Sequence, residues 1–388
     1  MCGHPIEADT SGSSVWCLKR ALPGLKGAPL CWGDHATKTL LEKHGLKQSA
    51  ADECVYFALD AKNKLVLLMM RHMDDYVVTG DKTRVKPLLD DMGITLLVSG
   101  IQVLEKPGDK TRILGSEVER LDFGYAIRAT KELIDAIVND EGLDACRVGK
   151  VPAEKQPSDA DLTPVDAKQH KHYRTQVGRL IYVAQHRSDL QHAVLRRSRS
   201  LAAPTNYDMH ALHKLIRYLS GTKHLRQVLA PRGRWTITAH SDSDWAGGTD
   251  RKSCSGGVVF LGGAMVLSLS RVQQAVSTSS CEAELYALTT VCAEAMYLRS
   301  LLESVGLPMD PPLVYSDSSS ALQVVGRRSV GKLKHVEVRL LALQGWQADH
   351  RVRTAKVRGD ENAAGFLTKA VALAIQERSI KQVGLSML

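Results

Sequence analysis

The sequence has no long uninterrupted apolar run. No stretch of its 388 residues approaches the ~18 uncharged apolar residues that a membrane-spanning helix needs. The first residues, MCGHPIEADTSGSS, contain neither a basic segment nor an apolar core, so no secretory signal peptide is expected. We therefore expect an intracellular protein that has no membrane partner.

Metal-binding and disulfide patterns are also missing among the cysteines. There are eight cysteines, none of which forms a C-x-x-C motif or lies at metal-ligand spacing from a histidine. With no secretory signal, this pattern predicts reduced and mostly buried thiols rather than disulfides or a zinc site.

Acidic residues are scarce in one part of the chain. Between Lys171 and Arg234 there are 13 Lys and Arg but only two acids, a net charge of +11, whereas the whole chain carries +9. A basic block in an otherwise nearly neutral chain predicts a polyanionic partner such as nucleic acid. The alternative is a solvated basic face with no partner. Five cations in the block are candidate nucleic-acid contacts: Arg196, Arg197, Arg199, Lys214 and Arg217.

The remaining composition is that of a folded protein with more than one domain. Hydrophobic residues make up 44% and charged residues 24% of the chain, and its length fits two or three domains. A proline-containing polar stretch at 150–170 and a Pro-Gly break near 231–233 are plausible linkers. We predict an α/β fold in three parts, covering 1–110, 111–232 and 233–388.

The middle and last parts differ in their periodicity. Three helices are predicted in the basic block, at His172–Ala184, Leu190–Leu201 and Asp208–Leu219. The last part alternates strands with helices, including a long helix at Glu282–Val305. Its predicted strands are Thr236–His240, Gly257–Leu261, Met265–Leu269, Leu313–Ser316 and Val352–Val357.

One candidate site is the acidic pair Asp74-Asp75. It lies between the apolar runs Leu65–Met70 and Tyr76–Thr79, a pattern typical of a β-hairpin. Adjacent carboxylates repel each other, and a divalent cation such as Mg²⁺ would neutralise them. The alternative is a pair of surface acids at a turn.

A second candidate site combines acids that are far apart in the chain. The sequence SDSDW at 241–245 ends one predicted strand, Glu282 begins the long helix, and Asp317 ends another strand. Carboxylates in such positions can converge at one edge of a sheet. Three of them would suit a hydrolase that cleaves phosphodiesters with two metal ions. The alternative is again a set of surface acids.

Several ordered motifs resemble those of one family. The chain is similar, over nearly its whole length, to the C-terminal part of a copia-type LTR retrotransposon Pol polyprotein. The matching segments are LKRALPGLKGAP (18–29), GLKQSAADECVY (45–56), HMDDYVVTG (72–80), YRTQVGRLIY (173–182), RYLSGT (217–222), SDSDWAGGTDRKSCSGGVVFLGG (241–263), STSSCEAELYAL (277–288), SDSSSAL (316–322) and LKHVEVR (333–339).

The resemblance implies a fold, activities and partners. It implies a truncated reverse-transcriptase palm at 1–110, a helical thumb and connection at 111–232, and an RNase H-like domain with a mixed sheet at 233–388. The activities implied are RNA-directed DNA synthesis and cleavage of RNA in RNA–DNA hybrids, with Mg²⁺ or Mn²⁺ as cofactor. The implied partners are an RNA–DNA hybrid or other nucleic acid and the rest of a Pol polyprotein, in the cytoplasm or in a virus-like particle.

The resemblance also assigns the acidic residues. The family's palm acids correspond to Asp74 and Asp75, and its RNase H acids correspond to Asp242, Glu282 and Asp317. Asp244 is an alternative to the first RNase H acid, and Glu284 is an alternative to the second. Because residues two apart on a helix point in different directions, only one of the two glutamates is expected to be a ligand.

Two departures from the family predict reduced activity. The family's first palm aspartate lies upstream of the segment resembling 18–29, further than this sequence extends, so the polymerase half is expected to be inactive alone. The last RNase H carboxylate is replaced by Gly365, and Asp360 or Glu361 could only partly substitute for it. We expect a fragment with weak Mg²⁺-dependent RNA cleavage. The alternatives are a catalytically dead nucleic-acid-binding remnant and a non-functional genomic relic.

Overall fold

The structure is a computed structural model that describes residue 22 and residues 24–142, 148–248, 250–327 and 338–387. The chain divides into two compact units, Met1–Ile101 and Gln102–Leu388. The predicted thumb and connection (111–232) and the predicted RNase H-like part (233–388) both lie entirely within the second unit. Much of the motif at 18–29 and most of the motif at 333–339 lie outside the described residues.

The structure bears on two expectations from the sequence, those for membrane-spanning helices and for the cysteines. None of the described helices is long and apolar enough to cross a membrane. The five cysteines with described thiols are all free, and Cys254 and Cys292 are buried. Cys31 is exposed, so the expectation of mostly buried thiols holds for only part of the set.

The first unit is a four-stranded antiparallel sheet with two helices. Its strands, in the order β1-β2-β3-β4, are Lys47–Gln48, Val55–Leu59, Leu65–His72 and Asp75–Gly80. Helix α1 spans Ala28–Glu42 and α2 spans Lys82–Thr95. Leu40, Tyr56, Met69 and Met92 are fully buried in one apolar cluster with both helices and the sheet. The predicted hairpin around the acidic pair is the β3–β4 hairpin.

The second unit begins with an antiparallel sheet built from distant parts of the chain. Its order is β14-β8-β7-β6-β5. The strands are β5 (Lys110–Ile113), β6 (Ser116–Leu121), β7 (Gly124–Ala129), β8 (Arg226–Leu229) and β14 (Leu385–Ser386). The side chain of Gln227 in β8 donates to the Val383 carbonyl at 2.8 Å, next to the β14 pairing.

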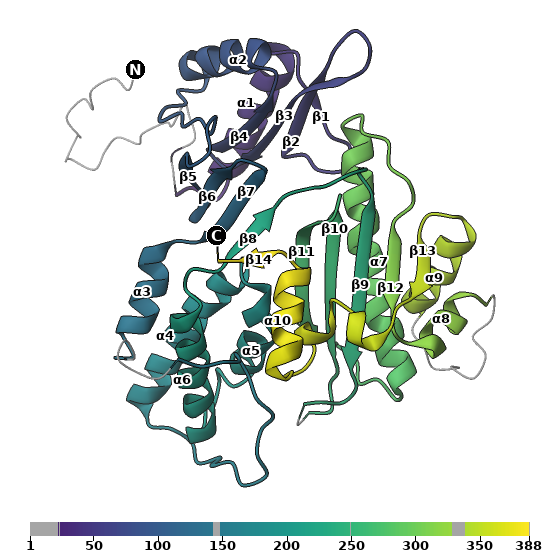
Figure 1. The fold of residues 1–388 in the computed structure, drawn as a ribbon. Helices are drawn as coiled ribbons and strands as arrows, with labels where there is room; N and C mark the ends of the chain where they lie inside the picture. The colour runs from purple at the N-terminus through teal and green to yellow at the C-terminus, as the bar shows by residue number, and fades with distance from the viewer. Residues whose placement is uncertain (1–21, 23, 143–147, 249, 328–337, 388) are drawn as a thin grey trace, which may run out of the picture. The chain divides into compact units, whose positions relative to one another are not determined.

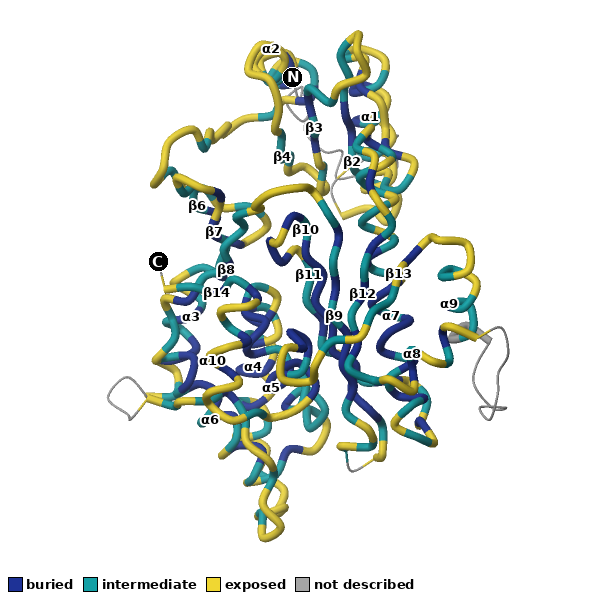
Figure 2. The backbone as a smooth tube through the Cα atoms, turned by 45° about the vertical axis from the view of Figure 1, so that its right-hand side comes forward, coloured by how far each residue is buried: buried dark blue, intermediate teal, exposed yellow. Residues whose placement is uncertain are grey.

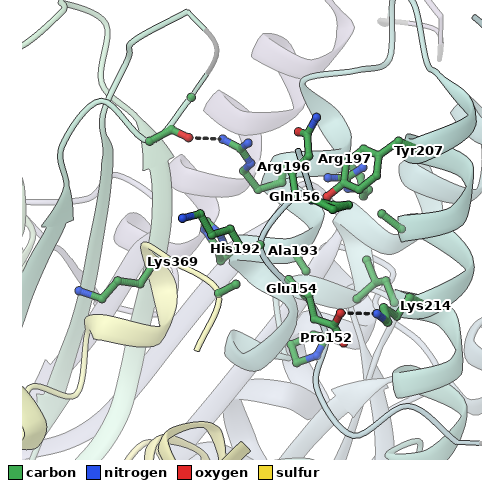
Figure 3. A pocket seen from close by; sticks show the side chains of 18 of the residues that line it. Pro152, Glu154, Gln156, His192, Ala193, Arg196, Arg197, Tyr207, Lys214 and Lys369 are labelled. Carbon is green, nitrogen blue, oxygen red and sulfur yellow. Dashed lines mark hydrogen bonds and ion pairs between the residues drawn. The ribbon is translucent and has the colours of Figure 1, made fainter. Parts of the chain in front are cut away.

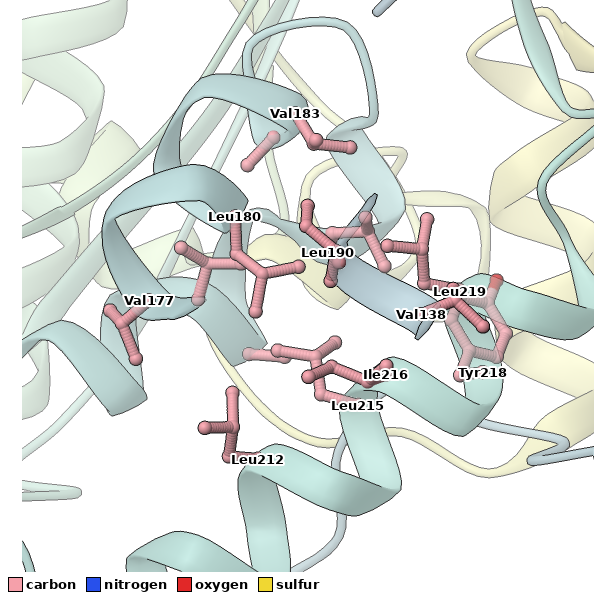
Figure 4. Close-up of a cluster of buried hydrophobic side chains, with 14 of the residues drawn as sticks. Val138, Val177, Leu180, Val183, Leu190, Leu212, Leu215, Ile216, Tyr218 and Leu219 are labelled. Carbon is pink, nitrogen blue, oxygen red and sulfur yellow. The ribbon is translucent and has the colours of Figure 1, made fainter. Parts of the chain in front are cut away.

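Four helices form the largest apolar core of the second unit. They are α3 (Lys131–Asn139), α4 (Ala167–Ala184), α5 (Ser188–Ser198) and α6 (Asn206–Gly221). The amphipathic pattern of α4 to α6 places Leu180, Leu190 and Leu215 in this core with no exposed surface, as Figure 4 shows. Helix α4 begins earlier than predicted because Asp166 and Gln169 form a capping box at its first turn.

A second, mixed sheet has the order β11-β10-β9-β12-β13 (Figure 1). Its strands are β9 (Ile237–Asp244), β10 (Cys254–Leu261), β11 (Ala264–Val272), β12 (Leu313–Ser316) and β13 (Arg353–Lys356). Strand β9 continues beyond its predicted end at His240, since Asp242 and Asp244 pair with Gly256 and Cys254 of β10. The mixed sheet confirms the predicted α/β class.

Both faces of this sheet are covered, which buries β9 and β10 (Figure 2). Two adjacent glycines of β10 permit the close packing. A Cβ atom on Gly257 would lie 2.3 Å from Val291 of helix α7, and one on Gly256 would lie 2.7 Å from Thr368. The covering elements are α7 (Ser280–Ser304), α8 (Ser319–Val325), α9 (Val338–Ala348), η1 (Gly359–Glu361), η2 (Gly365–Leu367) and α10 (Leu373–Gln382).

Candidate active site and the adjoining basic cavity

Three carboxylates meet at one end of the mixed sheet. Strands β9 and β12 are parallel neighbours in which Ser241 lies opposite Ser316, so the next residue of each chain segment, Asp242 and Asp317, reaches the same end of the sheet. Glu284, in the second turn of α7, joins them. One carboxylate oxygen from each of the three lies within 4.8 Å of the others.

Asp242 is the most enclosed of the three acids. Only 2% of the residue is exposed. The hydroxyl of Thr368 donates to its Oδ2, and the Lys369 ammonium lies 3.5 Å from the same oxygen. Burial raises the pKa of Asp242, and the Lys369 charge opposes that rise.

Glu284 has one carboxylate oxygen that is left unsatisfied. Its Oε2 is buried and has no hydrogen-bond partner. Burial, followed by the charges of Asp242 and Asp317, raises its pKa to about 8, although the Ser243 backbone N–H donates a hydrogen bond to this carboxylate. A buried carboxylate oxygen without a partner beside two further carboxylates is costly unless a cation neutralises it.

The chemistry of these donors fits a hard divalent cation. Mg²⁺ and Mn²⁺ prefer carboxylate oxygens, and Mg²⁺ keeps several waters while it is bound by one or two carboxylates. Asp242, Glu284 and Asp317 supply only oxygen ligands, and the unpartnered Oε2 of Glu284 is available to such an ion. The three residues could therefore hold one or more such cations.

Glu282, the glutamate predicted as the metal ligand, lies in the first turn of α7 and outside the carboxylate cluster. Its carboxylate accepts hydrogen bonds from the Thr278 backbone N–H at 2.7 Å and from the Thr278 hydroxyl at 2.8 Å. Its own N–H donates to the Ser279 side chain, which caps α7. The structure thus brings the alternative, Glu284, to the two aspartates and uses Glu282 at the helix start. The S-x-x-E spacing of Ser279 and Glu282 is a helix-start signal that could have indicated this.

Asp244, Asp360 and Gly365 also lie outside the carboxylate cluster. Asp244 accepts a hydrogen bond from the Cys254 backbone N–H at 2.6 Å. Asp360 forms an ion pair with Arg358 at 3.1 Å, so its charge is already compensated. Gly365 begins η2, and a Cβ atom there would meet no heavy atom within 4 Å. A larger side chain therefore has room at this position.

The acidic pair of the first unit has a different environment. Asp74 and Asp75 are both exposed at the β3–β4 turn, where Asp75 pairs with His72. Met73 takes a left-handed backbone conformation with φ of 56°, and its carbonyl accepts from the Trp32 indole at 3.0 Å. No third metal-ligating side chain joins the pair within the described part of this unit.

A basic cavity of about 720 Å³ adjoins the carboxylate cluster in the second unit (Figure 3). Its walls come from residues 152–157, from α5 and α6, from the end of β9 with the turn after it, and from residues 368–370. Thr368 and Lys369 line the cavity and also contact Asp242. The cavity therefore shares two of its wall residues with the immediate surroundings of Asp242.

The five predicted nucleic-acid contacts differ in how they are paired. Arg197 is buried and binds Asp208 at 2.6 Å, so it has a structural role. Arg199 pairs with Asp250, and Lys214 pairs with Glu154 at 2.5 Å. The last two cations form no ion pair with a carboxylate among the residues that the structure describes. Arg196 donates only to the Gly247 carbonyl at 3.4 Å, and Arg217 is half-buried with no partner at its Nε.

Comparisons with known proteins find similarity to reverse transcriptases and to Pol polyproteins. The family model described as "Reverse transcriptase (RNA-dependent DNA polymerase)" matches residues 3–155. The chain is 26% identical over 373 residues to the retrovirus-related Pol polyprotein from transposon RE1 of Arabidopsis thaliana, covering 95% of this chain and 25% of that protein. It is 27% identical to the Pol polyprotein from transposon TNT 1-94 of Nicotiana tabacum, covering 91% and 27% respectively.

The chain thus spans about a quarter of the length of these curated relatives. Among solved structures, a foamy viral protease-reverse transcriptase in complex with dsDNA is similar with a TM-score of 0.48 and 13% identity. That match covers 88% of this chain and 60% of the other.

Proposed function

The chain belongs to the copia-type retrotransposon Pol polyproteins, and we propose on that premise that its second unit cleaves the RNA strand of RNA–DNA hybrids. The proposed metal ligands are Asp242, Glu284 and Asp317. The observation that carries the proposal is their convergence, with the buried and unpartnered Oε2 of Glu284 among them.

Each residue of the site has a proposed part in this reaction. A divalent cation bound by the three carboxylates would activate water and stabilise charge on the phosphate. Thr368 fixes the orientation of the Asp242 carboxylate through its hydroxyl hydrogen bond. Lys369 places a positive charge beside the same carboxylate, where it can also attract a phosphate oxygen.

The proposal is tested by RNA cleavage with defined metal content. The full chain should cleave the RNA of a labelled RNA–DNA hybrid when Mg²⁺ or Mn²⁺ is added, and chelation by EDTA should stop cleavage. Asp242→Asn should lower the rate by about 10²- to 10⁴-fold, which corresponds to the loss of a metal ligand. Cleavage that persists in Asp242→Asn would assign the activity to a contaminating nuclease and contradict the proposal.

A second candidate function is nucleic-acid binding without catalysis. The observation that favours it is Gly365, which has no carboxylate where the family's last acid lies. In that case Mg²⁺ would bind without cleavage, or would not bind at all. Metal titration by calorimetry, run beside the cleavage assay, separates the two functions.

We further propose that the first unit does not support polymerisation by this chain alone. Asp74 and Asp75 are exposed and have no third ligand in the described part of their unit. The measurement is primer extension on an RNA template. Extension that disappears in Asp74→Asn would contradict this proposal.

A further inference from the structure

Two cations that line the basic cavity, Arg196 and the exposed Lys155, form no ion pair with an acid among the described residues. Arg196 lies on α5 and lines the cavity, and it donates only a long hydrogen bond, 3.4 Å, to the Gly247 carbonyl (Figure 3). Its neighbours Arg197 and Arg199 are each paired with an aspartate. Arg196 is thus the arginine of this cluster whose guanidinium remains available to an added anion.

The electrostatics around Arg196 favour such an anion. Burial, followed by the nearby charges of Arg199 and Arg197, lowers the pKa of Arg196. Neither acid that lines the cavity forms an ion pair with Arg196: Glu154 binds Lys214, and Asp244 accepts the Cys254 N–H, although the Asp244 charge opposes part of the fall in the Arg196 pKa. A phosphate group at this position would relieve the repulsion among the arginines and form a charge-assisted bidentate contact.

A second observation in the cavity wall also indicates a polar ligand. His192 lines the cavity one helical turn before Arg196, and its Nδ1 is buried without a hydrogen-bond partner. Burial, together with Arg196 and Arg197, lowers the pKa of His192 to about 4, so the ring is neutral near pH 7. The wall therefore contains an unsatisfied polar atom beside an unpaired cation.

We propose that this cavity binds the phosphate backbone of the nucleic-acid strand that extends from the carboxylate cluster, with Arg196 as its principal charged contact. The proposal rests on the proposed function and deepens it by naming where the substrate is bound. The volume of about 720 Å³ exceeds what a single phosphate needs. Thr368 and Lys369 line the cavity and also contact Asp242, which favours a strand that reaches both places over a free phosphate.

The test measures binding rather than cleavage. A fluorescein-labelled RNA–DNA hybrid is titrated with the full chain in EDTA over a series of salt concentrations. Arg196→Gln should weaken binding about tenfold and reduce the slope of log K against log salt by about 0.9. Arg196→Lys keeps the charge and should keep most of the slope. Thermal melting of each variant checks that it is folded.

The matched control is Arg179→Gln. Arg179 lies on α4, pairs with Asp140 and does not line the cavity, so the substitution makes the same charge change elsewhere in the unit. It should leave affinity and slope unchanged. An equal loss in Arg179→Gln, or no loss in folded Arg196→Gln, would overturn the proposal.

Small phosphates form the second arm of the test. Inorganic phosphate and uridine monophosphate are titrated against wild type and Arg196→Gln. If they bind in an Arg196-dependent way while hybrid binding does not depend on Arg196, the cavity takes a small phosphate and the strand assignment is wrong. A chain that binds through Arg196 but never cleaves would refute the proposed hydrolysis and leave the cavity assignment standing.

Discussion

Two acidic sites of the molecule contain the same kind of side chain in opposite environments. The Asp74-Asp75 pair lies at an exposed hairpin turn of the first unit, where water compensates the repulsion between adjacent charges. Asp242, Glu284 and Asp317 lie at the end of a sheet that is covered on both faces, and burial raises the pKa of Asp242 and Glu284. In the first case the charges cost little, and in the second they must be neutralised by a bound proton or by a cation.

The comparison shows what distinguishes the proposed metal site from a pair of neighbouring acids. Sequence proximity brings Asp74 and Asp75 together, but it supplies no third ligand. The cluster in the second unit draws its ligands from β9, α7 and the end of β12, so tertiary structure alone creates it.

The largest expected effect distinguishes the two glutamates of α7. Glu284→Gln should lower Mg²⁺-dependent RNA cleavage by about 10²- to 10⁴-fold, because it removes a proposed metal ligand. Glu282→Gln alters only the carboxylate that binds Thr278 at the helix start, so it should cost about 1 kcal/mol of stability and keep cleavage. Cleavage rates and thermal unfolding of both variants are the measurements. If Glu282→Gln abolished cleavage and Glu284→Gln lowered only stability, Glu282 would be the metal ligand instead.

A smaller effect is expected from adding an acid at position 365. Gly365→Asp places a carboxylate where the family carries its last RNase H acid, and the position has open space for a side chain. We expect cleavage to rise by about tenfold. Gly365→Ala is the control, since it also removes the conformational freedom of glycine but adds no charge. An equal gain in the alanine variant would attribute the effect to stability.

The third prediction concerns stability and pH in the absence of metal. The pKa of Glu284 is raised from its ordinary 4.5 to about 8, so the folded protein keeps a proton that the unfolded chain has released. Stability then falls as pH rises between those two values. The melting temperature of the second unit in EDTA should therefore drop by about 5 °C across this range.

Two additions to the melting experiment test its cause. Glu284→Gln cannot release this proton, so its melting temperature should depend less on pH. Mg²⁺ added at pH 8 should raise the melting temperature of wild type, because the ion binds the folded state. A pH profile that is identical in wild type and Glu284→Gln would disprove the assignment.

The smallest effect is expected at the exposed pair. Replacing Asp74 and Asp75 together by asparagine should leave RNA cleavage and the melting temperature almost unchanged, because surface substitutions outside special sites usually have little effect. The two measurements are those used for Glu284→Gln. A loss of cleavage comparable to that of Glu284→Gln would remove the distinction between the two acidic sites.

Much of the site could be predicted from the sequence because each ligand lies at the end of a recognisable element. Asp317 follows a strand whose predicted bounds, Leu313–Ser316, are those observed. The choice between Glu282 and Glu284 could not be made from spacing alone, because both lie in the first turns of α7. The choice depends on how the helix start is capped, which is a contact between side chains and backbone.

Which cation of the basic block is available was harder to predict, for a different reason. Arg197 and Arg199 stand near Arg196 in one sequence motif, yet their aspartate partners come from α6 and from the turn after β9. Net charge along the chain cannot reveal such pairings. It identified a region that contains the available cation but did not distinguish Arg196 from its paired neighbours.

The pairing of β14 with β8 has a consequence for the synthesis of the protein. Leu385 lies opposite Gln227, so the edge of the β5–β8 sheet stays open while nearly 160 further residues are made. An open strand edge is a site where another chain can pair, and contacts between distant residues form slowly. A nascent chain would therefore carry an aggregation-prone edge until residues 385–386 have been made and have paired with β8. Loss of those few residues would leave that edge exposed permanently.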